Sequence, residues 1–178
     1  MKRLFYLMVA AMLFPVISTA QELPYNNSVI YDLDLSRYLG KWYEIARFDH
    51  RFERGMDNVT AEYILRDDGA VDVINTGWKN GKVKVAKGKA IQPSPKDESA
   101  HLKVSFFGPF YSDYNVMMIG DDYEIALVGS KSPKYLWILA RNPYISDEVV
   151  GQVLEEAEGR GYNTGNLIWV DHSSFYRQ

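Results

Sequence analysis

The chain has 178 residues and contains no cysteine. Without a thiol it cannot form a disulfide, a thiolate metal site or a cysteine nucleophile, and no lipid can be attached through sulfur. It also lacks an excess of positive charge, because 20 Lys and Arg residues stand against 23 Asp and Glu residues, for a formal net charge of -3. A nucleic-acid partner is therefore not expected, since neutralising phosphates needs a clear cationic excess.

The sequence also lacks the short motifs that mark common catalytic and metal sites. It contains no GxSxG, P-loop, GxGxxG or HExxH pattern. Its three histidines, His50, His101 and His172, are not spaced as metal ligands, and His50 is expected on the surface. The sequence thus predicts no metal site, no cofactor and no enzymatic activity.

One long apolar run is present, at the N-terminus. Two basic residues precede an apolar stretch over residues 4–17, and small residues follow at 18–20. The stretch is shorter than the roughly 20 residues that a spanning helix needs, so we predict a secretory signal peptide over residues 1–20. The mature protein is then exported, as a periplasmic, outer-membrane-associated or secreted protein, and without cysteine it is not expected to be lipid-anchored.

From residue 40 onward, short apolar-rich segments alternate with turn signals such as Asn80-Gly81. They predict strands over residues 42–48, 59–65, 71–77, 82–91, 102–106, 114–119, 123–129 and 135–141. About eight strands with no helix between them predict an antiparallel up-and-down sheet, and closure into a barrel would remove its edges.

The pattern changes after Asn142-Pro143. Ser146 is a candidate N-cap, and apolar residues then recur at helical spacing up to residue 159. We predict a helix over about 146–159, packed on the outer wall of a barrel over about 40–141, with a short strand at 167–170 and a helical turn at 34–39. No repeat or linker divides residues 21–178, which we interpret as one domain.

Three motifs carry a resemblance to a known family. The segment GKWYEIAR at 40–47 resembles the G-x-W-Y opening strand of lipocalins, Asp122-Tyr123 stands where lipocalins carry Thr-Asp-Tyr, and Arg141 stands where they carry a lone Arg. Residues 33–171 look closer still to the bacterial outer-membrane lipocalins, relatives of apolipoprotein D. The resemblance implies an all-β fold, an eight-stranded antiparallel β-barrel with a C-terminal α-helix packed outside.

The resemblance gives the motif residues structural rather than chemical roles. It implies that Trp42 plugs the closed end of the barrel, with Arg141 stacked on its ring, and that Gly40, Asp122 and Tyr123 shape the turns there.

Strand alternation and the resemblance in register together assign an interior. It is mostly apolar, and small residues among large ones leave space for one ligand. The alternative is a barrel filled by its own side chains, and the strand at 123–129 is apolar on both faces. The predicted ligand-binding residues are Glu44, Ala46, Phe48, Val59, Ala61, Tyr63, Val73, Asn75, Val104, Phe106, Tyr114, Val116, Met118, Tyr135 and Trp137.

Two of these residues, Glu44 and Asn75, are polar groups in an apolar interior. A buried carboxylate needs a partner or a raised pKa. Either a neighbouring Tyr or Arg satisfies Glu44, or the pair contacts a ligand head or a bound water.

Connections at the open end predict a cationic rim. Such a rim above an apolar pocket suits an anionic amphiphile, although nearby acidic residues also allow simple solvated loop charges. Phe107, Phe110 and Tyr111 form an aromatic lip that gates entry, touches a membrane surface or folds down. The rim residues are Arg51, Arg54, Lys79, Lys82, Lys131 and Lys134.

The resemblance favours an exported lipid-binding protein that holds a fatty acid or lysophospholipid in its barrel, for transport or storage in the cell envelope. Three alternatives stay open: a lipid isomerase or hydrolase using Glu44 with Tyr63 or Tyr135, a chromophore carrier, and a filled barrel that acts through its surface. The resemblance also allows a homodimer and transient contact with a membrane surface.

Overall fold

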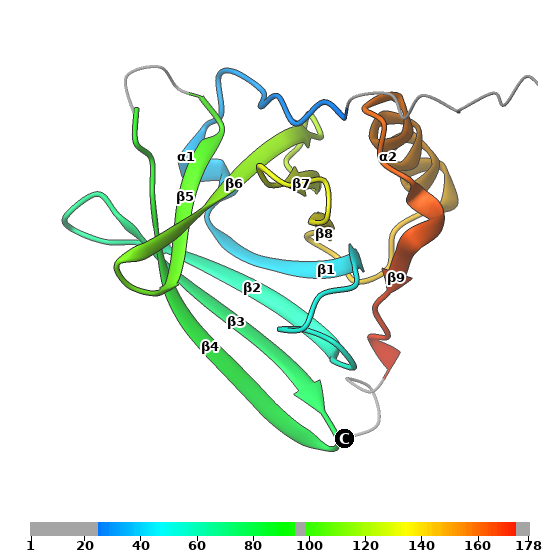
Figure 1. Ribbon diagram of the computed structural model, residues 1–178, viewed down its shortest axis with the longest axis horizontal. Coiled ribbons are helices and arrows are strands. Elements are labelled where there is room, and N and C mark those ends of the chain that lie inside the picture. The colour runs from blue at the N-terminus through cyan, green and yellow to red at the C-terminus, as the bar shows by residue number, and fades with distance from the viewer. Residues whose placement is uncertain (1–24, 95–98, 174–178) are drawn as a thin grey trace, which may run out of the picture.

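A computed structural model describes residues 25–94 and 99–173 of the chain (Figure 1). The predicted signal peptide lies outside the described residues. A helical turn, α1 (Leu35–Tyr38), precedes the strands, and helix α2 (Asp147–Gly159) and a 3-10 turn at Thr164–Asn166 lie between the eighth strand and the ninth. The strands are β1 (Gly40–Phe48), β2 (Asp57–Leu65), β3 (Val71–Lys79), β4 (Lys82–Ile91), β5 (His101–Phe107), β6 (Phe110–Ile119), β7 (Ile125–Gly129), β8 (Leu136–Ala140) and β9 (Leu167–Trp169).

The first eight strands form a closed antiparallel barrel. Each strand pairs with the next along the chain, and β1 pairs with both β8 and β2, which closes the sheet. The short β9 pairs with β1 beyond the residues that β2 occupies, so β2 and β9 share one edge of that strand. The predicted eight-stranded up-and-down barrel is confirmed, with β9 as one added strand.

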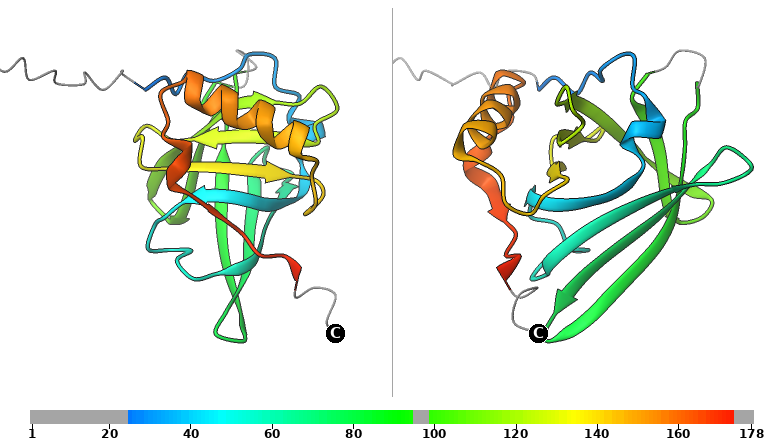
Figure 2. Two further views of the ribbon diagram at one scale, coloured as in Figure 1. Left: turned by 90° about the vertical axis from the view of Figure 1, so that its right-hand side faces the viewer. Right: turned by 180° about the vertical axis from the view of Figure 1, so that it is seen from behind.

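Helix α2 packs on the outside of this barrel, as Figure 2 shows. Its buried residue Val153 belongs to a second apolar core between the helix and the sheet. In β7, Ala126 and Val128 face the barrel interior, whereas Ile125 and Leu127 face this outer core. The strand is apolar on both faces because the helix covers the side that would otherwise meet water.

Two β-bulges decide which residues face the interior. The register of β1 against β8 shifts between Glu44 and Ala46, and the register of β6 against β7 shifts between Val116 and Met118. A bulge inserts one extra residue, so every later side chain changes face. The prediction that Ala46, Phe48 and Met118 point inward is therefore wrong: they pack in the outer core beneath the helix.

The hairpin of β3 and β4 extends beyond the one formed by β5 and β6 (Figure 1). Its turn residues Asn80 and Gly81 both have positive φ, 54° and 71°, as a two-residue hairpin turn requires. Strand β4 pairs with β5 only from Lys89 to Ile91. Among the described residues, positions 82–88 of β4 thus have a strand partner on one side only.

Candidate functional site

The barrel encloses a cavity of about 480 Å³. Its wall is built by side chains from seven of the eight barrel strands and from the segment at 49–56 that joins β1 to β2. Most of the lining is apolar or aromatic. These lining residues are Phe52, Met56, Val59, Val73, Gly77, Ala86, Val104, Phe106, Phe107, Phe110, Tyr114, Tyr135, Trp137 and Leu139.

The predicted ligand-binding residues fall into three groups in the structure. Ala61, Tyr63 and Val116 are buried in the interior core together with Trp42. Ala46, Phe48 and Met118 lie outside the barrel, as described above. The remaining residues border the cavity: Glu44, Val59, Val73, Asn75, Val104, Phe106, Tyr114, Tyr135 and Trp137.

The closed end of the barrel is filled around Trp42, which is fully buried. The Arg141 guanidinium lies over its ring, 3.8 Å from the centroid, and the indole N–H donates to the Tyr38 carbonyl at 2.8 Å. Arg141 also donates to the carbonyls of Arg37 and Lys41, at 2.6 and 2.9 Å. This cation–π stack and its hydrogen bonds seal the barrel floor.

The turn at Asp122-Tyr123 fastens α1 to the same end. The Tyr123 hydroxyl accepts from the Asp34 backbone N–H at 2.8 Å, and the Arg37 guanidinium lies 4.2 Å from the centre of its ring. Gly40 begins β1 with φ of +88°, and a side chain on it would meet the Arg141 guanidinium at 3.5 Å. A residue without a side chain therefore suits this position.

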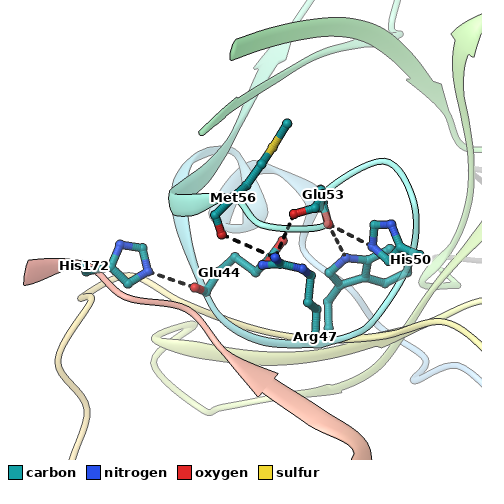
Figure 3. A network of polar contacts seen from close by, with 7 residues as sticks. Glu44, Arg47, His50, Glu53, Met56 and His172 are labelled. Carbon is teal, nitrogen blue, oxygen red and sulfur yellow. Dashed lines mark hydrogen bonds and ion pairs between the residues drawn. The ribbon is translucent and has the colours of Figure 1, made fainter. Parts of the chain in front are cut away.

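A buried polar network lies toward the open end (Figure 3). Arg47 turns inward because of the bulge in β1, and its guanidinium donates to Glu44 Oε1 at 2.6 Å. The same guanidinium donates to the carbonyls of Glu53 and Met56, at 2.8 and 3.3 Å. The structure thus pairs Glu44 with an arginine, and one side chain ties the segment at 49–56 to the barrel wall.

Glu53 completes this network with contacts of its own. Its Oε2 accepts from the Trp137 indole N–H at 3.2 Å and lies 2.9 Å from His50 Nε2. Burial would raise the Glu53 pKa, but the contacts with His50 and Trp137 and the charge of Arg47 outweigh it and lower the pKa. Burial, together with the facing Glu53 carboxylate, raises the Glu44 pKa well above its usual value despite Arg47. Arg47 is thus the cation of a network whose two carboxyl groups have pKa values shifted in opposite directions.

His50 is buried rather than on the surface, with 9% of its area exposed. Its ring packs among three aromatic rings, with centroids 5.4 Å from Trp137, 5.8 Å from Tyr135 and 6.1 Å from Phe52. No local sequence signal marks His50 or Glu53 as part of a buried network, because their partners come from β1 and β8.

The predicted cationic rim is only partly available to a ligand. Arg54 forms an exposed ion pair with Asp49 at 2.7 Å, and Lys79 donates to the Arg54 carbonyl at 2.6 Å. The Arg51 guanidinium lies 4.8 Å from the centre of the Phe52 ring. Lys82, Lys131 and Lys134 are exposed.

Two further features border the cavity. Lys84, which the sequence analysis did not single out, lines it from β4. The alternation that points Ala86 inward could have identified Lys84, two residues earlier on the same strand. Phe107 and Phe110 also line the cavity while 73% and 79% of their areas are exposed.

Comparison with known proteins assigns the family. Residues 33–172 match the family model described as a lipocalin-like domain. The chain belongs to the lipocalin family. This lipocalin is 48% identical over 164 residues to the outer membrane lipoprotein Blc of Citrobacter freundii, across 91% of this chain and 92% of the relative. It is 50% identical over 149 residues to the protein of the same name from Escherichia coli K12, across 83% and 84% of the two chains.

The solved structures agree on the fold. Insecticyanin from the tobacco hornworm Manduca sexta superposes with a TM-score of 0.70 at 24% identity, over 85% of this lipocalin and 87% of that chain. The family model and the two bacterial relatives confirm the resemblance to bacterial outer-membrane lipocalins that the sequence predicted. In the described part of the chain, no helix combines the length and the apolar character that crossing a bilayer needs.

These relatives correct the predicted localisation. Both bacterial relatives are named outer membrane lipoproteins, and a lipoprotein carries attached lipid. The prediction that this lipocalin is not lipid-anchored is wrong by that comparison. Its lack of cysteine speaks only to attachment through sulfur and does not decide how or where the protein is held.

Proposed function

We propose that this lipocalin binds one fatty acid or lysophospholipid in its barrel and transports or stores it in the cell envelope. The observation that carries the proposal is the cavity of about 480 Å³ with its mainly apolar lining. That volume falls in the range of about 300–1,000 Å³ that is usual for small-molecule sites. The family membership supports a lipid-binding role, and the names of the two bacterial relatives support a place in the cell envelope.

Burial of the acyl chain supplies the affinity. Each buried methylene contributes about 0.8 kcal/mol, so ten give about 8 kcal/mol before the costs of association. Association costs about 4 kcal/mol or more of that gross value, and each further buried methylene adds to it. The acyl chain therefore supplies the larger part of the affinity, and polar contacts of the head group add to it.

The head group is expected at the open end. Lys84 borders the cavity there, and the rim lysines Lys82, Lys131 and Lys134 are exposed nearby. Because burial raises its pKa, Glu44 repels an anionic head group less than an ordinary carboxylate would. The exposed Phe107 and Phe110 flank the route into the cavity and give it an apolar edge.

The test uses residues 21–178, purified from a host that exports the protein. Native mass spectrometry with organic extraction should find a co-purifying fatty acid or lysophospholipid, and calorimetry should show rebinding after delipidation. Ala86→Trp, at a small residue that borders the cavity, should narrow the cavity and weaken binding. Val85→Trp is the matched control, because Val85 is the neighbouring residue on the same strand and is 56% exposed. An apo mass with no binding of either lipid class would overturn the proposal.

One observation favours a second candidate function. Glu44 and Glu53 border the same cavity with pKa values shifted in opposite directions, which is how a general acid and a general base are set apart. A lipid hydrolase or isomerase would use this pair. Turnover of lipid esters that disappears in Glu44→Gln would establish it, and a rate equal to that of buffer alone would exclude it for those substrates.

A further inference from the structure

Three tyrosine hydroxyl groups meet at the deep end of the cavity. Tyr114 Oη lies 2.6 Å from Tyr38 Oη and 2.7 Å from Tyr63 Oη. Burial raises the pKa of all three hydroxyl groups, which therefore remain O–H donors at neutral pH. Three protons serve two hydrogen bonds, so one donor is left over whichever way the bonds run.

Tyr114 is the member of this cluster that borders the cavity. Both shared hydrogen bonds end on its oxygen, which can accept from Tyr38 and Tyr63 at once and still direct its own proton into the cavity. The apolar residues of this interior core include Trp42, Val71 and Val116, and the charges of Glu44, Glu53 and Arg141 also act on Tyr63. Among the described residues, none of the hydrogen bonds found takes the third proton.

Asn75 supplies the complementary group on the cavity wall. Its side-chain oxygen is buried and, within the described part of the chain, has no hydrogen-bond partner. Asn75 borders the cavity from β3, and its neighbours in register on both sides are alanines, Ala61 and Ala86. These small neighbours leave room for the amide group to turn toward the cavity. A buried acceptor without a donor is unfavourable and points to a missing partner.

The register places this acceptor close above the tyrosine cluster. Val73 is opposite Tyr63, and Asn75 follows two residues later toward the open end. Val73 and Asn75 are successive inward-facing positions of the strand. The deep half of the cavity thus presents one hydrogen-bond donor, from Tyr114, and one acceptor, from Asn75.

We propose that Asn75 and Tyr114 form a subsite for a hydroxyl group on the buried part of the ligand, so that the cavity selects a hydroxylated acyl chain over plain hydrocarbon. A hydroxyl group both donates and accepts, and so it satisfies the Asn75 oxygen and the left-over tyrosine proton together. This inference rests on the proposed function, because it names which amphiphile the same cavity prefers.

The experiment compares three acids of equal chain length by calorimetry. Hexadecanoate has no hydroxyl group, ω-hydroxyhexadecanoate carries one at the deep end, and α-hydroxyhexadecanoate carries one beside the head group. The wild-type chain should prefer the ω-hydroxy acid. In Asn75→Leu and in Tyr114→Phe that preference should fall by about tenfold or more, while affinity for hexadecanoate changes little or rises.

Ser130→Ala is the matched control, because Ser130 also borders the cavity but follows β7 rather than lying in the deep half. Its preference should equal that of the wild-type chain. Thermal unfolding of each variant identifies any that fails to fold. Either Asn75→Leu or Tyr114→Phe alone is sufficient for the test. Equal relative affinities for the three acids in wild type and variants would overturn the subsite while leaving the proposed function intact. Failure of all three acids and of lysophospholipid to bind would overturn both.

Discussion

Replacing Arg47 with Met should destabilise the fold far more than replacing any exposed arginine. Arg47 is 1% exposed and holds three partners: the Glu44 carboxyl group and the carbonyls of Glu53 and Met56. Met keeps much of the apolar volume but removes the charge and every donor. The buried Glu44 carboxyl group would then lose its ion-pair partner, and Glu53 would lose a nearby positive charge.

The size of the loss follows from that buried ion pair. Removing one partner of a buried ion pair typically costs about 3–5 kcal/mol. The loss of stability is smaller than the upper end of this range, because the variant also removes an unfavourable group. Arg47 Nε is buried and has no hydrogen-bond partner among the described residues. We therefore expect a loss of about 3 kcal/mol, which lowers Tm by about 6–12 °C in a domain of this size.

Urea unfolding followed by tryptophan fluorescence measures the free energy, with Arg54→Met as the matched control. Arg54 pairs with Asp49 at the surface, and such pairs contribute about 0–1 kcal/mol. Glu44→Gln in the Arg47→Met background should recover stability, because it removes the carboxyl group that has lost its partner. A loss below about 1 kcal/mol in Arg47→Met, or no recovery in the double variant, would refute the assignment of Arg47 as the cation that stabilises this network.

Three other outcomes are expected. Burial raises the Glu44 pKa above the unfolded value of 4.5. Glu44 therefore stabilises the fold fully below pH 4.5, and this contribution is lost as pH rises through the folded pKa. Urea unfolding across pH should show a smaller loss of unfolding free energy with rising pH in Glu44→Gln than in the wild-type chain. Arg141→Met should cost about 1–3 kcal/mol, since it removes the stack on Trp42 together with hydrogen bonds to backbone carbonyls, and Arg141→Lys should recover only part of it in the same assay. Gly88→Ala should cost about 1–3 kcal/mol in thermal unfolding, because its Cβ would lie 2.7 Å from a β5 carbonyl oxygen; an unchanged Tm would mean that β4 and β5 separate easily.

Strand order, helix and closed end were accessible from the sequence because they depend on local patterns. Asn80-Gly81 carries its own turn conformation, and Ser146 caps α2 by accepting from the Val149 backbone N–H. Alternation within a strand also separates the two faces correctly while the strand is regular, as Trp137 and Leu139 on β8 show.

The polar network was not accessible in the same way. Residues three apart in a regular strand point to opposite faces, so Glu44 and Arg47 could not be paired from their spacing. The bulge that brings them together depends on how β1 meets β8, and apolar residues on both sides of it leave no trace in the sequence. Ala46 and Phe48 were misassigned for the same reason, because the outer core beneath α2 is as apolar as the interior.

The unpaired stretch of β4 has a consequence for how copies of the protein behave toward one another. An open strand edge is a template on which a second chain can add a strand. The exposed side chains of Val83 and Val85 make this edge apolar and therefore favour such association. Lys82, Lys84 and Lys87 interrupt the apolar pattern, and each would bring its charge against the same charge in an approaching copy. Lys84, which borders the cavity, therefore also helps to protect the barrel from edge-to-edge aggregation.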